Sequence, residues 1–236
     1  MPGEILDWSD ISLVVFDMDG TLYDQRPLRW RMLAVLLHET VRTASLDTLL
    51  TLREFRRSRE VLATKSCGNF LDAQYAVPAA RRGCPPEHVR SLVTEWIEKR
   101  PLAYLSQCRR PGVDRVFAAL RIAGKRIGIL SDYPAREKLA ALGLDADFVV
   151  SSTDEDVGRP KPDPAGLFKL MRLAEVDPRQ TLLIGDREDR DWEVARRSNV
   201  PARILGHRFH AEVDCFDSFS DPLFDPLLRA PAACGA

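Results

Sequence analysis

Short runs of apolar and β-branched residues recur in the first and last parts of the chain. The first run, residues 11–16 (ISLVVF), is followed by acidic residues and a glycine, as expected where a buried strand gives way to a turn. Four similar runs lie at residues 126–130, 148–151, 181–184 and 202–205. We predict that all five are strands of one sheet and that the first has its carboxyl end at Asp17.

Segments with helical spacing of apolar residues alternate with these runs, at residues 111–123, 134–142 and 164–174. The first segment begins with Pro111 and is followed by Gly124, residue types favoured at the start and just past the end of a helix. Strands and helices that alternate across short turns indicate an α/β fold, a doubly wound, Rossmann-like parallel sheet. Ligands of such sheets bind at the carboxyl ends of the strands.

The middle of the chain lacks this alternation. Helical spacing of apolar residues recurs there at residues 28–41, 46–62 and 89–97. One stripe on the first of these helices, typical of a face that packs against a neighbour, contains Trp30, Leu33, Leu37 and Val41. We predict an all-helical cap domain at residues 25–107, inserted into a core domain made of residues 1–24 and 108–236.

Composition places the chain among globular proteins. Of its 236 residues, 45% are hydrophobic, which is enough for a sizeable core. The first ten residues have no apolar signal region, and no uninterrupted apolar stretch reaches about 18 residues. The five cysteines form no C-x-x-C pair, so neither a disulfide framework nor a zinc site is indicated. We expect a soluble, cytoplasmic protein without a membrane partner.

Charge is unevenly distributed. Residues 25–110 hold 16 Lys and Arg against 8 Asp and Glu, a net +8, while the remainder holds 18 against 27, a net −9. This asymmetry favours an insert that attracts an anion and a core that holds a cation. The alternative is that the arginines only solvate helix faces. No run is basic enough to indicate nucleic acid as the main partner.

The most informative motif is Asp-Met-Asp-Gly-Thr, which starts at Asp17 directly after the first predicted strand. Two carboxylates about 4 Å apart repel by roughly 4 kcal/mol at an effective dielectric constant of about 20, so the pair requires a cation. Gly20 allows the backbone to turn tightly there. A calcium-binding EF-hand loop is excluded because its glycine comes at the sixth position and here it is the fourth. The alternative is a surface turn whose two aspartates have no catalytic or metal-binding role.

Further polar residues follow the ends of later predicted strands. Ser131 closes the second strand, and its hydroxyl and the following amides are placed to hold phosphate oxygens. Lys161 lies among prolines that stiffen its turn before a helix. Asp186 closes the fourth strand and Asp191 follows it, which suits oxygen ligation of a hard cation. Taken singly, each has a simpler explanation: a strand-end serine, a solvated lysine and helix-capping aspartates.

Together, Asp-x-Asp-Gly-Thr, the strand-end serine, the proline-flanked lysine and Gly-Asp-x4-Asp resemble the motifs of the haloacid dehalogenase superfamily. The resemblance covers both ends of the chain, and the helical insert is similar to the cap of the first type in that family. It implies a Mg²⁺-dependent phosphatase of the branch that includes phosphoglycolate phosphatase and β-phosphoglucomutase. Such an enzyme hydrolyses a small phosphomonoester through an aspartyl-phosphate intermediate.

The resemblance also assigns roles to the residues of the site. Asp17 is the expected nucleophile, and Asp19 the expected general acid and base. Ser131 and Lys161 are expected to hold phosphoryl oxygens. Asp132 stands beside them where relatives most often have Asn, which puts the phosphate-site contact expected there in doubt.

The expected ligands of Mg²⁺ are the side chains of Asp17 and Asp186 and the main-chain carbonyl of Asp19, with Asp191 supporting the site. Tyr23 and Asp24 are placed in a moving flap. Candidates for substrate contact in the cap come from its weakly periodic middle, above all Arg81 and Arg82, together with Lys65, Asn69 and Tyr75. With no further ligand nearby, His207 and His210 are interpreted as surface residues.

Three other functions compete with phosphatase activity. A dehalogenase would not need Asp19, which is suited to protonating an alkoxide leaving group. A phosphosugar mutase of the β-phosphoglucomutase type shares the same motifs and stays open. A binding or regulatory module that has lost catalytic activity is disfavoured, because every motif residue that the chemistry needs is present. We expect a small phosphorylated metabolite as partner and a monomer or homodimer.

Overall fold

The computed structural model describes residues 6–64, 69–206 and 212–229. At its centre lies a six-stranded parallel sheet with the strand order β3-β2-β1-β4-β5-β6. The strands are β1 (Leu13–Asp17), β2 (Arg126–Ser131), β3 (Phe148–Ser151), β4 (Thr181–Gly185), β5 (Ala202–Leu205) and β6 (Cys215–Phe216). The doubly wound parallel sheet predicted from the sequence is confirmed.

All five predicted strands are present, with small shifts at their ends. β1 begins at Leu13, two residues later than predicted, and includes Asp17. β6 was not predicted, because two residues are too short to show a period. β1 lies between β2 and β4, so the strand that carries Asp17 occupies the middle of the sheet.

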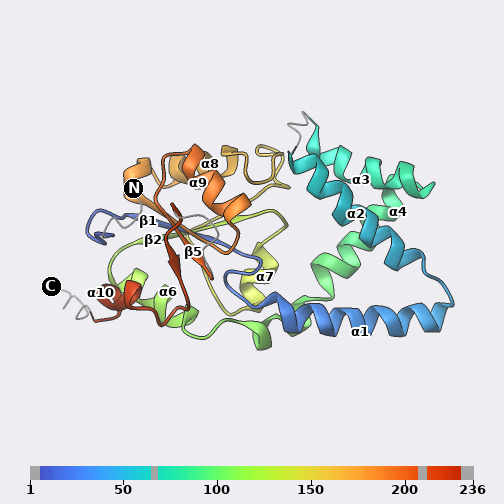
Figure 1. Cartoon of the computed structure of the whole chain (residues 1–236), viewed down its shortest axis with the longest axis horizontal. Coiled ribbons are helices and arrows are strands. Elements are labelled where there is room, and N and C mark those ends of the chain that lie inside the picture. Colours follow the sequence, from blue (N-terminus) through green and yellow to red (C-terminus); the bar gives the residue numbers. More distant parts are fainter. Residues whose placement is uncertain (1–5, 65–68, 207–211, 230–236) are drawn as a thin grey trace.

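Helices cover both faces of the sheet, because successive side chains of a strand point to opposite sides. Val14 and Phe16 pack in one core, with α6 (Val113–Ile122), while Leu13 and Val15 pack in the other, with α8 (Ala165–Leu173). The sheet and these helices form the left part of Figure 1. The other helices of this part are α7 (Arg136–Ala141), α9 (Glu193–Arg197) and α10 (Asp225–Leu228).

The described residues from 25 to 108, mostly on the right of Figure 1, form helices joined by short turns. They are α1 (Gln25–Thr43), α2 (Asp47–Thr64), α3 (Phe70–Arg82), α4 (Pro86–Val93) and α5 (Leu102–Leu105), with a π-helical turn at Thr94–Lys99 and a 3-10 turn at Ser106–Cys108. We call them the helical segment. It has its own apolar cluster, in which Phe55 and Tyr75 stack at 5.8 Å between ring centroids. No helix among the described residues is long and apolar enough to cross a membrane.

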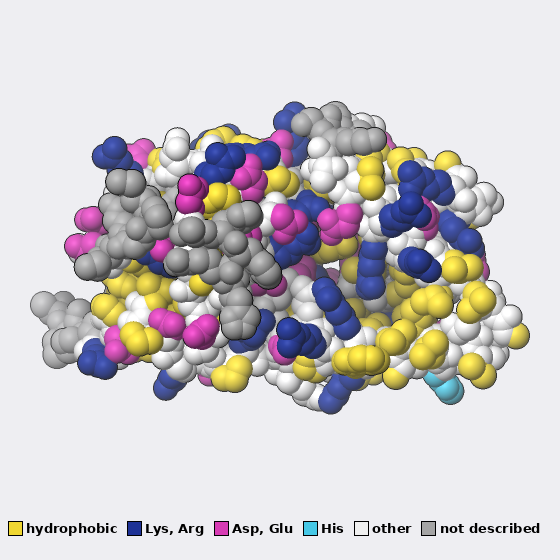
Figure 2. Space-filling model, in the orientation of Figure 1, with side chains coloured by type: hydrophobic (Ala, Val, Ile, Leu, Met, Phe, Trp, Pro, Cys, Tyr) yellow, Lys and Arg dark blue, Asp and Glu magenta, His cyan; other side chains and the backbone are white. Residues whose placement is uncertain are grey.

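The apolar stripe predicted on α1 is not a packed face. Trp30 is 73% exposed and Val41 is 82% exposed, and Leu28 is the one buried side chain of α1, whose residues are all described. Hydrophobic side chains accordingly gather on the surface of the helical segment in Figure 2. Helical periodicity predicted the helix correctly but not its partner, because the spacing of residues does not say which neighbours the fold supplies.

Candidate active site

Four of the predicted site residues meet at the carboxyl edge of the sheet. Asp17 is the last residue of β1 and Ser131 is the last residue of β2. Asp186 follows β4 directly, and Lys161 lies in the loop before α8. Parallel strands end at one edge, so these residues come together although they are far apart in sequence.

Lys161 lies at the centre of this group. Its Nζ is 2.5 Å from Oδ1 of Asp17 and 2.6 Å from Oδ1 of Asp191, and its side chain is 5% exposed. Burial lowers the pKa of Lys161, but the charges of Asp17 and Asp191 outweigh it and hold that pKa well above its usual value. The ammonium therefore stays charged. It is a buried cation at the carboxyl edge of the sheet, where ligands of such folds bind.

One cation does not neutralise the surrounding carboxylates. Burial raises the pKa of Asp17 well above its usual value, and the neighbouring charges of Asp191 and Asp186 add to this despite the opposing charge of Lys161. Burial and Asp191 likewise raise the pKa of Asp186 to about 6. Both shifts mean that the ionised forms of Asp17 and Asp186 are disfavoured in the protein alone, and a further cation nearby would stabilise them.

The donor set suits a hard divalent cation. Oxygen atoms of Asp17, Asp186 and Asp191 lie within 4.8 Å of one another. Oδ1 of Asp186 is buried and accepts no hydrogen bond from the described residues. Carboxylate oxygens are the ligands that Mg²⁺ prefers. The residues present therefore fit a magnesium ion.

Two glycines permit the close approach of these carboxylates. A Cβ on Gly20 would lie 2.1 Å from Oδ2 of Asp186, and the φ of Gly20 is +113°, which disfavours other residues. A Cβ on Gly185 would lie 2.3 Å from the Cβ of Asp191. Oδ2 of Asp191 accepts hydrogen bonds from the main-chain amides of Asp186 (3.1 Å) and Arg187 (3.0 Å). Asp191 thus orders the loop that presents Asp186.

Asp19 lies beside this group and has its own partners. Oδ1 of Asp19 accepts hydrogen bonds from Nζ of Lys138, at 2.6 Å, and from the hydroxyl of Tyr23. Burial raises the pKa of Asp19, but the charge and hydrogen bond of Lys138 and the hydrogen bond of Tyr23 outweigh it, and the pKa lies below its usual value. The main-chain carbonyl of Asp19 accepts a hydrogen bond from the side-chain amide of Gln25. Asp19 is therefore ionised and fixed in place.

Lys138 was not among the residues singled out in the sequence, although one sign of it was present. It lies in α7, the helix that follows β2 at the carboxyl edge of the sheet, where ligands of such sheets bind. There its ammonium pairs with the carboxylate of Asp19.

Asp132 has a structural task that explains its place after Ser131. Its Oδ1 accepts a hydrogen bond from the main-chain amide of Lys161 at 2.9 Å. This contact needs only an oxygen acceptor, which Asp supplies as well as Asn would. Oγ of Ser131 accepts a hydrogen bond from the main-chain amide of Tyr133 at 3.2 Å. The loop after β2 is thus tied to the loop that carries Lys161.

Arg59, on α2, joins the helical segment to this loop. Its guanidinium donates hydrogen bonds to the main-chain carbonyl of Asp132, to Oγ of Ser152 at 3.1 Å and to Oε1 of Gln74 at 2.7 Å. It also lies 4.0 Å from the centre of the Tyr133 ring. Sequence reasoning missed Arg59 because its partners are distant in the chain and its position looked like an ordinary helix face.

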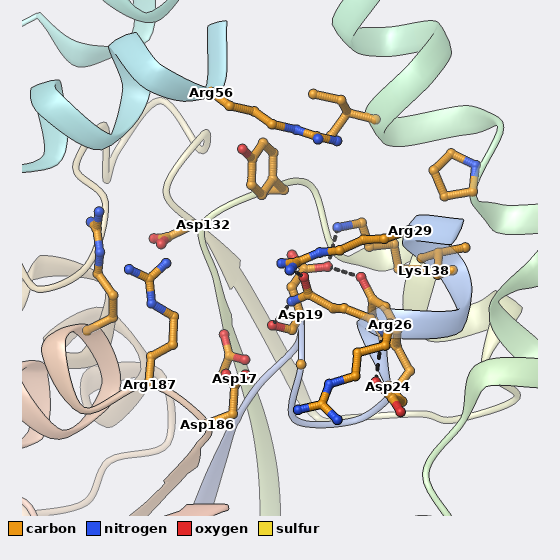
Figure 3. A pocket seen from close by; sticks show the side chains of 18 of the residues that line it. Asp17, Asp19, Asp24, Arg26, Arg29, Arg56, Asp132, Lys138, Asp186 and Arg187 are labelled. Atoms are coloured by element: carbon orange, nitrogen blue, oxygen red, sulfur yellow. Dashed lines mark hydrogen bonds and ion pairs between the residues drawn. The ribbon is translucent and has the colours of Figure 1, made fainter. Parts of the chain in front are cut away.

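Most of these residues line one cavity of about 1210 Å³ between the sheet edge and the helical segment; Ser131, at the end of β2, is not in its lining. Figure 2 shows a hollow between the two parts with Lys and Arg side chains around it, and Figure 3 shows the residues that line it. From the sheet side it is lined by Asp17, Asp19, Asp132, Lys138, Lys161, Asp186 and Asp191, and from the helical segment by Arg26, Arg29, Arg56, Arg59, Leu36, Leu52 and Trp96, among others.

The predicted substrate contacts in the helical segment lie elsewhere. Arg81 pairs with Glu54 at 2.7 Å, Arg82 pairs with Asp47 at 3.1 Å, and neither lines the cavity. Their placement therefore argues against the predicted substrate contact: both join α3 to α2.

The remaining sequence candidates are outside the site or outside the described residues. Tyr75 packs in the apolar cluster of the helical segment, and Asn69 caps the start of α3 by accepting a hydrogen bond from the amide of Asp72. Lys65, His207 and His210 lie outside the described residues.

Comparison with known proteins agrees with this arrangement. The family model described as haloacid dehalogenase-like hydrolase matches residues 11–199. The chain is 29% identical over 196 residues to glyceraldehyde 3-phosphate phosphatase of Methanopyrus kandleri, covering 80% of this chain and 82% of that protein. It is 27% identical over 238 residues to phosphoglycolate phosphatase of Mesorhizobium japonicum, covering 92% and 97%.

Solved structures share the fold. A HAD phosphatase of Thermococcus onnurineus superposes with a TM-score of 0.64 at 22% identity, covering 92% of this chain and 98% of that one. A 2-haloacid dehalogenase of Pseudomonas syringae gives a TM-score of 0.66 at 20% identity, covering 93% and 98%. With a family model that spans most of its length, this chain belongs to the haloacid dehalogenase-like hydrolases.

Proposed function

We propose that this protein is a Mg²⁺-dependent phosphatase that hydrolyses a small phosphomonoester through an aspartyl-phosphate intermediate. The observation that carries the proposal is the convergence of Asp17, Asp186 and Asp191 around Lys161, with Asp19 held beside them. The relatives named as phosphatases of small phosphorylated compounds support the same class of substrate.

In the first half of the reaction, a carboxylate oxygen of Asp17 attacks phosphorus, and the bond between phosphorus and the ester oxygen breaks. The leaving oxygen takes its proton from Asp19. Asp19 is ionised in the structure, but a phosphoryl group brings negative charge into the site, and a like charge nearby raises the pKa of a carboxyl group. The substrate itself therefore favours the acid form of Asp19 that this step needs.

In the second half, Asp19 has lost its proton and accepts one from water, and the oxygen of that water attacks the aspartyl-phosphate. The bond between phosphorus and the Asp17 oxygen breaks, so phosphate leaves and the carboxylate is restored. Lys161 and Ser131 hold the phosphoryl oxygens in both halves. Asp17, Asp186 and the carbonyl of Asp19 would hold a magnesium ion, with Asp191 supporting them, and the ion would further neutralise the phosphoryl charge.

The helical segment fits the role of a cap. We propose that residues 25–107 form this cap over a core made of residues 1–24 and 108–236, since the cavity lies between the two sets of elements. Asp19 favours phosphoester chemistry over dehalogenation, because a halide leaving group needs no proton. A phosphosugar mutase would use the same residues and is distinguished by its product.

The test is release of inorganic phosphate from p-nitrophenyl phosphate and from a panel of phosphorylated metabolites, with Mg²⁺ and with EDTA. We expect turnover that needs the metal and that Asp17→Asn abolishes while the circular dichroism spectrum is unchanged. Equal turnover in EDTA, or by Asp17→Asn, would overturn the proposal. Accumulation of an isomeric sugar phosphate in place of phosphate would identify a mutase.

A further inference from the structure

The cationic side chains that line the cavity fall into two groups. Those nearest the sheet have acceptors within the protein. The matched cations are Lys138 with Asp19, Lys161 with Asp17 and Asp191, Arg59 with the carbonyl of Asp132, Arg110 with the carbonyl of Gly20, and Arg187 and Arg190 with Glu60. Each of these charges already has an acceptor within the protein.

Arg26, Arg29 and Arg56 form the second group. Across the described residues, no carboxylate pairs with any of these three guanidinium groups. Arg29 donates one hydrogen bond, to Oε1 of Gln25, and the guanidinium groups of Arg26 and Arg56 donate none within the described part of the chain. A guanidinium carries five N–H donors in a planar fork that matches a carboxylate or a phosphate.

Arg29 and Arg56 face the same space from different helices. Arg29 belongs to the first turns of α1, and Arg56 belongs to α2. In the view of Figure 3 the side chains of Arg29 and Arg56 both reach into the cavity, Arg29 from α1 and Arg56 from α2. Much of the wall between these helices is apolar, lined by Leu33, Leu36, Leu49 and Leu52. An anion there would find these two cations as its main polar partners on that wall.

Arg29 is connected to the reacting end of the cavity. It donates to the side chain of Gln25, and Gln25 in turn donates to the main-chain carbonyl of Asp19. The guanidinium is therefore two hydrogen bonds away from the residue that would protonate the leaving oxygen. A group bound by Arg29 would therefore lie on the same side of the site as Asp19.

We infer that Arg29 and Arg56 form a second anion site, which binds a carboxylate or phosphate on the leaving group of the substrate. Arg26 lies at its rim. This inference rests on the proposed phosphatase function and narrows its substrate class to phosphomonoesters that carry a second negative group. A second anion site would also account for part of the net positive charge of residues 25–110.

Two pairs of substrates test the site. 2-Phosphoglycolate carries a carboxylate where 2-hydroxyethyl phosphate carries a neutral hydroxymethyl group, and fructose 1,6-bisphosphate carries a second phosphate that fructose 1-phosphate lacks. In one of the two pairs we expect kcat/KM to be about tenfold or more higher for the compound with the second anion. The pair that shows it identifies the chemistry of the group.

Arg29→Ala and Arg56→Ala should each remove most of this preference, mainly through KM, while kcat/KM for the compound without the second anion changes less than about threefold. Arg56→Lys should keep part of the preference for the compound with the second anion. Arg57→Ala is the matched control, since Arg57 is an exposed neighbour on α2 that does not line the cavity. The Arg57→Ala variant should show the same preference as the natural sequence.

The outcome separates this inference from the proposed function. Suppose that p-nitrophenyl phosphate is hydrolysed but neither pair shows a preference, or that the variants keep the preference. The second anion site is then refuted, and the proposed phosphatase function is not affected. Calorimetric binding of 2-phosphoglycolate and fructose 1,6-bisphosphate to Asp17→Asn gives a readout without turnover. Binding of either that Arg56→Ala weakens about tenfold supports the site even if hydrolysis fails, and equal binding by both proteins refutes it.

Discussion

Nζ of Lys138, on α7, lies 2.6 Å from Oδ1 of Asp19, in the turn after β1, so a buried cation holds the side chain that is proposed to move protons. The lysine favours the ionised carboxylate and is one reason why the pKa of Asp19 is below its usual value in spite of burial. Asp19 therefore depends on Lys138 both for its position and for its charge.

Replacing Lys138 with Met should move the pH dependence of turnover. Without the ammonium, the pKa of Asp19 rises, so Asp19 stays protonated to a higher pH and activates water less well. We expect the acidic limb of the kcat profile to shift to higher pH and kcat near neutrality to fall about 10- to 100-fold. A profile that keeps its acidic limb would contradict this role. Lys169→Met, which removes a lysine paired with Asp156 away from the cavity, should leave the profile unchanged.

Gly20→Ala should damage the site more than the fold. The new Cβ would meet the carboxylate of Asp186 at 2.1 Å, and alanine is strained at a φ of +113°. We expect Mg²⁺ affinity and turnover to fall at least about 100-fold, because Asp186 has to turn away, with roughly 1–3 kcal/mol lost from the free energy of unfolding.

Gly83→Ala provides the control for backbone strain. Gly83 also has a positive φ, +66°, but a Cβ there meets nothing within 4 Å. It should cost about 1–2 kcal/mol of stability and leave Mg²⁺ binding unchanged. Denaturant unfolding and calorimetric titration with Mg²⁺ measure both effects. Equal Mg²⁺ affinity in the two variants would show that the contact with Asp186 is unimportant.

Arg59→Ala should loosen the attachment of the helical segment to the sheet. The side chain is buried and bonds to the carbonyl of Asp132 and the hydroxyl of Ser152, both on the sheet side of the cavity. Losing hydrogen bonds from a charged donor should lower the free energy of unfolding by about 1.5–3 kcal/mol. We also expect faster limited proteolysis of the helical segment. Arg57→Ala, an exposed change two residues away on α2, should alter neither quantity.

Much of the sheet and of its polar edge was predictable because both depend on local sequence. A strand buried on both faces is an unbroken apolar run, and the carboxyl ends of parallel strands share one edge. The order of these runs along the chain was therefore enough to place Asp17, Ser131 and Asp186 near one another. β6 is too short for this reasoning.

The helical segment was less predictable because helical periodicity identifies a helix but not what surrounds it. The stripe on α1 that contains Trp30 looks like a buried face and is exposed. Arg81 lies in a non-periodic stretch and looked free, yet it pairs with Glu54 on a neighbouring helix. Arg59 and Arg56 lie on the same helix and differ only in what the fold places opposite them. Such differences are set by tertiary packing.

Stability of the metal-free protein should fall as pH rises through the range in which Asp186 ionises. The pKa of Asp186 is raised to about 6 by burial and by the charge of Asp191. A carboxyl group whose pKa is raised on folding stabilises the protein fully below its unfolded value, near 4, and that contribution is lost as pH passes the folded value. The raised pKa of Asp17 acts in the same direction. We therefore expect the Tm in EDTA to decrease between about pH 5 and pH 7.

Mg²⁺ should reverse this trend, because the ion binds the ionised carboxylates and has to displace their protons at lower pH. At about 100 times its dissociation constant a ligand adds roughly 2.7 kcal/mol, which corresponds to a rise in Tm of about 5–10 °C for a chain of this size. With the Mg²⁺ concentration fixed, the rise should be largest at pH 7 to 8 and small at pH 5, as measured by differential scanning calorimetry. Asp186→Asn should weaken both the decrease in EDTA and the rise with Mg²⁺. Asp17 and Asp186 still hold protons at pH 5 and have to release them to bind the ion, so binding at these residues has to depend on pH. An equal rise in Tm with Mg²⁺ at pH 5 and pH 7.5 would therefore mean that the ion binds elsewhere.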